Sequence, residues 1–181
     1  MSKLLNLKAI ALATCALHPL APAMAQEINL PMREGARPET SNRVPHVQIG
    51  IEVNRSLAEE LLARVDQFPG VTLGPTRVSL PGAVGFQFDQ GVPLERPESI
   101  PGGREFAHLH PDGSLHAALD PELAIKAVEA GWAIHHPWAD KRDGWGGLVM
   151  LYTPQTEAEL EIVFDLVEAS YEYITGRAPS I

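Results

Sequence analysis

The sequence is poor in cysteine and in basic charge. Its 181 residues include one cysteine, Cys15, and 14 Lys and Arg residues against 23 Asp and Glu residues, which gives a net charge of −9. A single cysteine excludes an intrachain disulfide and a zinc site built from several thiolates. Without a basic patch, nucleic acid and anionic membrane surfaces are not expected partners, whereas a small-molecule substrate is.

The sequence also lacks the motifs of several enzyme classes. It has no G-x-S-x-G, so Ser114 has no nucleophile elbow. It has neither a phosphate-binding glycine loop nor a dinucleotide fingerprint. Serine hydrolases of the elbow type and nucleotide-dependent enzymes are therefore disfavoured.

The first 25 residues have the layout of a secretory signal peptide. Two lysines precede the apolar run 9–17, two prolines follow it, and Ala23-Met24-Ala25 is a small-x-small cleavage signal. The run is shorter than the roughly 20 residues that span a bilayer. We therefore predict a signal peptide over 1–25, a periplasmic or secreted protein, and no stable membrane insertion after cleavage. A retained anchor is the alternative.

Composition divides the remaining chain into two parts. Residues 26–53 are polar and irregular in pattern, and they predict a linker or a loosely attached, extended arm. Residues 54–177 alternate between helical and strand patterns, and their length predicts one domain.

Three helices are predicted from capping residues and apolar spacing. Ser56 and Glu59 form a capping box at the start of the first, and Asp120 followed by Pro121 opens the second. Glycine ends the second and third helices. The predicted segments run from Ser56 to Phe68, from Asp120 to Gly131 and from Thr156 to Gly176.

Strand-like segments lie between these helices. Residues 147–152 (GLVMLY) are apolar on both faces, which is typical of a central strand. Helices separated by clusters of strands predict an α+β fold, with an antiparallel or mixed sheet and helices packed mainly on one face. The other predicted strands are residues 71–73, 77–80, 83–88 and 132–134, with a hairpin over 105–119.

The hairpin segment 105–119, EFAHLHPDGSLHAAL, contains three of the seven histidines. A two-residue loop would mix leucines and histidines on each face of the hairpin. A three-residue loop, 111–113 with a left-handed glycine, instead pairs Leu109 with Leu115. Burial of these two leucines contributes roughly 3–6 kcal/mol and selects the three-residue loop.

In this register the two faces of the hairpin differ in polarity, because side chains alternate along a strand. His108 pairs with His116, and His110 pairs with Ser114. One face carries Ala107, Leu109, Leu115, Ala117 and Leu119, and the other, the histidine face, carries Phe106, His108, His110, Ser114, His116 and Ala118.

Imidazoles on one face allow two kinds of chemistry. His108, His110 and His116 can hold Zn, Fe, Ni or Cu and leave one coordination position open. Alternatively, a histidine titrates near neutrality and takes a proton from a phenol or an enol. Of the adjacent pair His135 and His136, only one can face the cluster if that segment is extended.

Several motifs resemble the fungal luciferase-like family, a domain also found in many bacterial proteins of unknown role. They are REFAHLHPDGSLHAALDPE, EAGWAIHHPWA and LVMLYTPQTEAELEIV, with LPGAVGF upstream, and the similarity covers roughly residues 56–176. The resemblance implies oxidation of a small enolic compound by O₂ without an added organic cofactor. A histidine would deprotonate the enol, and the resulting carbanion would attack O₂.

We therefore predict a small exported enzyme that acts on an enolic or aromatic compound and needs no cofactor. The alternatives are a metal-dependent enzyme with a divalent transition metal on the same histidines, and a non-catalytic periplasmic ligand-binding domain. Tyr152 is added to the site because it ends the central strand. The predicted catalytic residues are His108, His110, His116 and His136, and the predicted substrate-binding residues are Asp112, Ser114, Trp132 and Tyr152.

Overall fold

The computed structural model describes residues 28–180, and the predicted signal peptide lies outside them. None of the helices within the described residues is both long and apolar enough to cross a membrane. The helices are α1 (Arg55–Val65), α2 (Pro121–Glu129) and α3 (Glu157–Thr175), with a 3₁₀ turn at Pro97–Ser99. The strands are β1 (Glu39–Thr40), β2 (Gln48–Ile49), β3 (Val71–Pro75), β4 (Val84–Phe88), β5 (Glu105–Leu109), β6 (Leu115–Ala118), β7 (Ala133–His135) and β8 (Leu148–Leu151).

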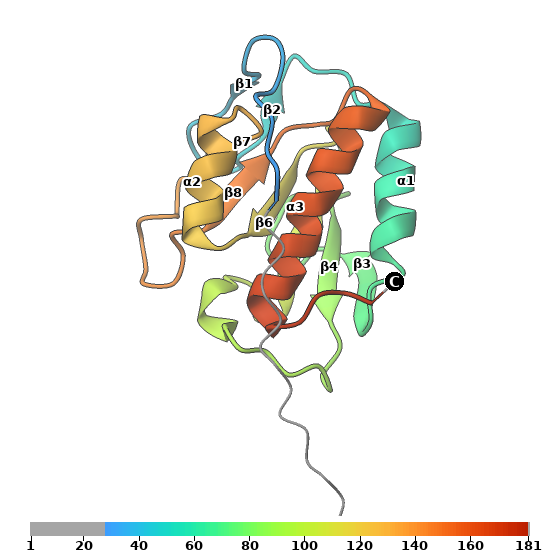
Figure 1. Cartoon of the computed structure of the whole chain (residues 1–181), viewed down its shortest axis with the longest axis vertical. Coiled ribbons are helices and arrows are strands. Elements are labelled where there is room, and N and C mark those ends of the chain that lie inside the picture. Colours follow the sequence, from blue (N-terminus) through green and yellow to red (C-terminus); the bar gives the residue numbers. More distant parts are fainter. Residues whose placement is uncertain (1–27, 181) are drawn as a thin grey trace, which may run out of the picture.

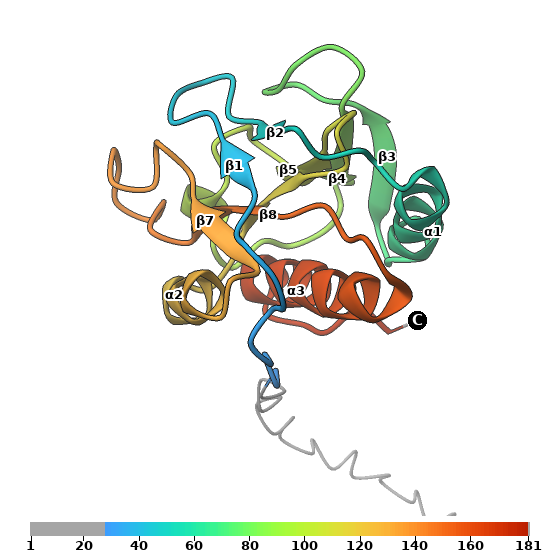
Figure 2. The ribbon, with the colours of Figure 1, turned by 90° about the horizontal axis from the view of Figure 1, so that it is seen from above.

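Strands β3 to β8 form one antiparallel sheet in the order β3-β4-β5-β6-β8-β7. In Figure 1 the three helices stand in front of this sheet. Figure 2 shows α2 and α3 beneath the sheet, and the two-stranded β1-β2 unit on its other side. The α+β fold, with an antiparallel sheet and helices mainly on one face, is therefore confirmed.

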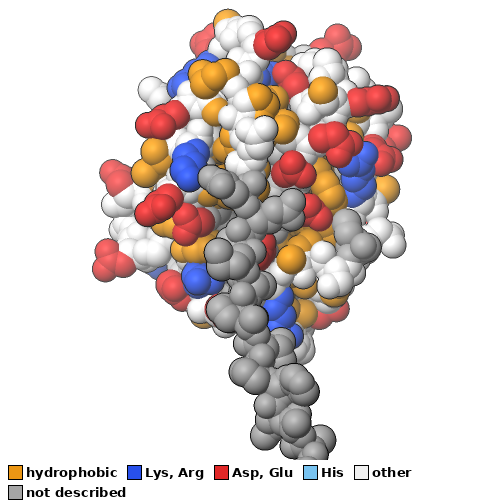
Figure 3. Space-filling view, in the orientation of Figure 1, with side chains coloured by type: hydrophobic (Ala, Val, Ile, Leu, Met, Phe, Trp, Pro, Cys, Tyr) orange, Lys and Arg blue, Asp and Glu red, His pale blue; other side chains and the backbone are white. Residues whose placement is uncertain are grey.

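The helix-bearing face of the sheet carries the core. Helix α3 packs against β5 and β6, and α1 packs beside α3. Leu109 and Leu115 are 5% and 1% exposed, and Leu151 on β8 is fully buried. On the outer surface of this side, the acidic and basic side chains of residues 28–180 are scattered and form no basic patch (Figure 3).

Two local predictions are wrong in an instructive way. The first helix is capped by Asn54, whose carboxamide oxygen accepts from Leu57 N, so Ser56 is not the cap. Residues 77–80 form no strand, because the Thr76 hydroxyl accepts from Val78 N at 3.2 Å and bends the chain there. The caps at Asp120 and Thr156, and the left-handed glycine at Gly176, are confirmed.

Residues 28–53 are extended, but they are not a loose tether. Arg33 N donates to Ala130 O at 2.8 Å, and the Arg33 guanidinium pairs with Glu159 at 3.2 Å. The Trp132 indole N–H donates to Pro31 O at 2.6 Å. Further along, His46 is 3% exposed. This segment therefore lies against the domain. It starts beside α2 and α3, and its part around β1 and β2 lies on the sheet face opposite the helices (Figure 2).

Candidate functional site

The β5-β6 hairpin has the three-residue loop that the apolar pattern predicts. His108 pairs with His116, and Leu109 pairs with Leu115. His110 N donates to Ser114 O at 2.8 Å, and Gly113 has φ 80°. A Cβ at Gly113 would lie 2.7 Å from Thr153 Cγ2, so both backbone angle and space require glycine. The register places the three imidazoles on the sheet face away from the helices.

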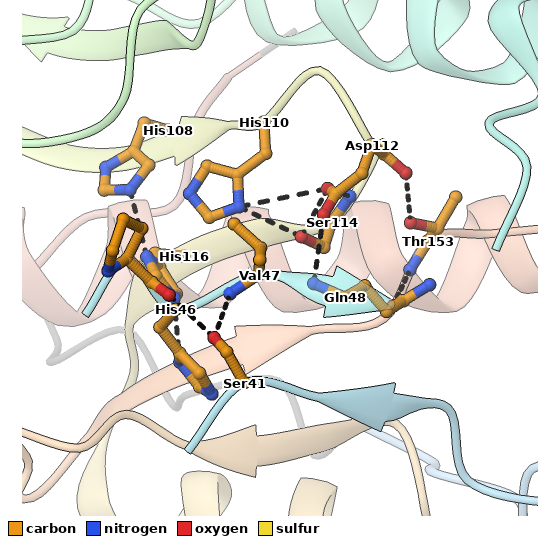
Figure 4. Close-up of polar contacts among 11 residues, drawn as sticks. Ser41, His46, Val47, Gln48, His108, His110, Asp112, Ser114, His116 and Thr153 are labelled. Atoms are coloured by element: carbon orange, nitrogen blue, oxygen red, sulfur yellow. Dashed lines mark hydrogen bonds and ion pairs between the residues drawn. The ribbon is translucent and has the colours of Figure 1, made fainter. Parts of the chain in front are cut away.

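Asp112 and Ser114 position His110 rather than line the site. The Asp112 carboxylate accepts from Ser114 N at 2.9 Å and from the Ser114 hydroxyl at 2.7 Å. Its second oxygen accepts from Gln48 N at 3.0 Å, which ties the loop to the N-terminal segment (Figure 4). His110 Nδ1 lies 3.0 Å from the Ser114 hydroxyl oxygen, so the imidazole is held from one side.

A β-bulge changes the face of two residues at the start of β5. Phe86 pairs with Ala107, but Gln87 pairs with Glu105, so Phe106 is skipped in the register. Phe106 therefore points to the core, where its ring stacks on Phe88 at 4.4 Å. The prediction that Phe106 lies on the histidine face is wrong, and Glu105 takes that face instead.

Glu105 is a buried carboxylate, 3% exposed, bonded to His108. Its oxygens lie 3.0 Å from His108 Nδ1, 2.6 Å from the Thr76 hydroxyl and 2.7 Å from Arg77 N. Burial alone raises the pKa of Glu105, but these hydrogen bonds outweigh it and lower the pKa overall. The residue is therefore an anionic anchor for the His108 ring.

A chain of imidazoles continues from this carboxylate. His108 Nε2 lies 3.0 Å from His116 Nδ1, and His116 Nε2 lies 3.1 Å from His46 Nδ1 (Figure 4). The ring of His136 crosses that of His116 at 4.6 Å between centroids. His136 Nδ1 accepts from Trp138 N at 3.0 Å, which orients its ring. Five imidazoles therefore form one cluster, and His135 is exposed outside it.

The cluster opens into a cavity of about 330 Å³. The lining includes Glu105 and all five clustered imidazoles, and its remaining surface is largely apolar. Val44, Val78 and Trp138 line it and are 47%, 42% and 38% exposed, so they mark its opening. A small, mostly apolar compound fits such a site, with imidazoles as its polar contacts.

Burial favours the neutral form of four of these five histidines. It lowers the pKa of His46, and together with the charges of neighbouring imidazoles it lowers the pKa of His110 and of His136 to about 4. Burial and the neighbouring imidazoles also hold the pKa of His116 well below its usual value. At neutral pH these rings therefore present lone pairs, which suit a general base or a metal ligand.

Trp132 and Tyr152, predicted to bind substrate, lie elsewhere. They are 5% and 3% exposed and do not line the cavity. The Arg33 guanidinium carbon lies 5.9 Å from the Trp132 ring centre and 5.7 Å from that of Tyr152. The two rings anchor the N-terminal segment, so this placement does not fit a substrate-binding role.

Two residues of the site, His46 and Glu105, are not predicted from the sequence. His46 lies in the segment predicted as a loose arm, and no local pattern connects it to a hairpin 70 residues away. Strict alternation along β5 puts Glu105 on the leucine face, and the bulge reverses this. The available signal for Glu105 is an acidic side chain on a face predicted to be buried.

Comparison with known proteins finds relatives of this chain. Residues 103–170 match the family model described as Luciferase domain. The chain is 31% identical over 169 residues to a luciferase of Armillaria mellea and 30% identical to a luciferase of Neonothopanus nambi. Each alignment covers 82% of this chain and 62% of the relative, so the chain spans less than two thirds of those proteins.

No solved structure gives a significant match. The matched region contains the complete β5-β6 hairpin with His108, His110 and His116, together with His136. The motifs, the family match and the similarity to two fungal luciferases agree with one another. The chain therefore carries a domain of the fungal luciferase-like family.

Proposed function

We propose that this protein oxidises a small enolic or aromatic compound with O₂ in the cavity beside the histidine cluster. The observation that carries the proposal is the set of neutral, buried imidazoles along one wall of a largely apolar cavity. Such a cavity holds a flat organic molecule and excludes bulk water. The similarity to luciferases of Armillaria and Neonothopanus supports oxidation chemistry.

The reaction follows from neutral imidazoles beside an acidic O–H or C–H group. An imidazole takes the proton, and the electron-rich carbon of the enolate forms a C–O bond with O₂. The carbon is oxidised, O₂ is reduced to a peroxide anion, and the imidazolium returns its proton to give a hydroperoxide. The imidazolium also stabilises the developing negative charge in a site that excludes water.

The catalytic roles predicted for His108, His110, His116 and His136 belong to this proposal. His116 is central, because its ring lies between His108 and His46 and is crossed by His136. Asp112 and Ser114 contribute by fixing His110 through their shared hydrogen bonds.

An oxygen electrode tests the proposal. The full-length protein is supplied with a panel of enolic pyrones and phenols, and binding of each compound is measured in parallel by calorimetry. We expect O₂ uptake with at least one bound compound, and loss of that uptake in His108→Ala. Compounds that bind without O₂ uptake would instead support a non-catalytic ligand-binding domain.

A further inference from the structure

We propose that His108, His110 and His116 form a three-imidazole site for one first-row transition metal ion. The ligand atoms are Nε2 of His108, Nε2 of His110 and Nδ1 of His116. The nitrogens that these three residues offer lie within 4.8 Å of one another. This inference goes beyond the proposed oxidation, since the ion binds whether or not a substrate is present. While bound, it occupies lone pairs that otherwise take a proton, and it favours the transition-metal alternative over the prediction of no cofactor.

One nitrogen of His110 is buried and has no hydrogen-bond partner among the described residues. His110 is 3% exposed, and this nitrogen is its Nε2. The Asp112 carboxylate can only accept, so the Ser114 hydroxyl hydrogen points to Asp112, and the Ser114 oxygen accepts from His110 Nδ1–H. The proton therefore sits on Nδ1, and Nε2 carries a lone pair.

That lone pair points into the cluster. In Figure 4 the His110 nitrogen that is not bonded to Ser114 faces the side of His108 and His116. A buried polar atom without a partner is destabilising, because it has lost its hydrogen bonds to water. A metal ion removes this cost because it accepts the lone pair directly.

The His108 ring is oriented by Glu105, so that its Nε2 points toward His116. Glu105 can only accept a hydrogen, so His108 Nδ1 donates to it, and Nε2 is the nitrogen of His108 that is left to bind an ion. This Nε2 lies 3.0 Å from His116 Nδ1. Two nitrogens at this separation, each about 2.0–2.1 Å from an ion, subtend about 95° at it, which lies within the range of transition-metal geometries.

Each of the three rings has a hydrogen-bond partner on the nitrogen that would not bind the ion. Glu105 holds His108, the Asp112-Ser114 pair holds His110, and His46 Nδ1 lies 3.1 Å from His116 Nε2. When an ion binds Nδ1 of His116, the proton of this ring moves to Nε2 and forms a hydrogen bond to His46 Nδ1. Metal-binding histidines commonly have such outer partners, which fix the tautomer and orient the ring.

The neighbouring set His46, His116 and His136 fits an ion less well. His136 Nδ1 already accepts from Trp138 N, and none of these three residues has a buried nitrogen without a hydrogen-bond partner among the described residues. Within the first set, three imidazoles form one wall of the cavity, so the remaining coordination positions face its interior. Imidazole ligands select Fe, Co, Ni, Cu or Zn over Mg or Ca, which prefer oxygen.

Metal analysis of the full-length protein, purified without a histidine tag, tests the site. The protein is incubated with Fe(II), Cu(II) or Zn(II), dialysed, and analysed by plasma mass spectrometry. We expect about one ion per chain for wild type and less than about a tenth of this for His110→Ala. His135→Ala is the matched control, because this exposed histidine lies outside the cluster, and it should bind like wild type.

Glu105→Gln provides a second variant that keeps all three ligands. Loss of its charge should weaken metal affinity about 10- to 100-fold, measured by competition with a chelator. A wild-type protein that retains none of these ions, or a folded His110→Ala that retains as much as wild type, would overturn the site. Metal binding without O₂ uptake would leave the site intact and overturn only the proposed oxidation.

Discussion

The two faces of the β5-β6 hairpin differ sharply in what their side chains contact. On one face Leu109 and Leu115 are buried in the core beneath α3. On the other face, one residue along each strand, His108 and His116 are hydrogen-bonded to each other. His110 is bonded to Ser114, and its Nε2 has no hydrogen-bond partner among the described residues.

This difference shows how a small domain separates stability from chemistry. Burial of the leucine face supplies free energy and fixes the register. The same register then places the imidazoles on the opposite face, since alternation permits no other arrangement. The histidines are therefore positioned by residues that pack on the far side of the sheet, and changes on the two faces should have separable effects.

The largest expected effect comes from the histidine face. His116→Ala removes the ring that links His108 to His46, so we expect turnover to fall about 10²- to 10⁴-fold. The free energy of unfolding should change by about 1 kcal/mol, since α3 and the leucines are untouched. O₂ uptake and urea denaturation measure the two quantities. Uptake equal to that of wild type would remove His116 from the catalytic site.

The opposite face should show the reverse pattern. Leu115→Ala leaves a cavity under α3, and we expect the free energy of unfolding to fall by about 2–5 kcal/mol. Turnover per folded molecule should stay near the wild-type value, because Leu115 does not line the cavity. Urea denaturation and O₂ uptake in the absence of urea check both statements. A large loss of turnover in a fully folded sample would show that the two faces are coupled.

A smaller effect is expected where β4 supports the histidine face. A Cβ at Gly85 would lie 2.8 Å from the Glu105 carboxylate and 3.1 Å from Thr76 Cα. Gly85→Ala should therefore displace Glu105 from His108 and lower the free energy of unfolding by about 1–3 kcal/mol. At its cross-strand partner Gly74, an added methyl group would have no atom within 4 Å, so Gly74→Ala is the matched control. Equal denaturation midpoints for the two variants would contradict this packing.

Most of the fold follows from local patterns in the sequence. Caps and apolar spacing predict the three helices, and alternation with a Pro-Asp-Gly turn predicts the hairpin register. The cap of the first helix is not predictable in this way, because Asn54 and Ser56 are both good capping residues two positions apart. In the structure Asn54 is the cap, and the Ser56 hydroxyl donates to its carboxamide oxygen.

The candidate site is only partly predictable, because two of its features depend on long-range structure. The bulge that turns Glu105 toward His108 forms only when β5 pairs with β4. His46 reaches the cluster because Gln48 and Arg33 bind the domain through residues far apart in sequence. Neither arrangement leaves a periodic signal in the segments concerned.

The central claim is that the hairpin directs its imidazoles into a buried cavity, where burial lowers the pKa of His110 and His116. Nuclear magnetic resonance of the imidazole nitrogens in chelator-treated protein, titrated from about pH 7.5 to about pH 3.5, tests this claim most directly. We predict midpoints of about 4 for His110 and His136, with a lower than usual midpoint for His116. The unfolded chain then binds more protons below the usual histidine pKa, so stability should fall as the pH drops through this window. Midpoints near 6.5 for all three, with no loss of stability, would place the rings in bulk solvent and contradict the account.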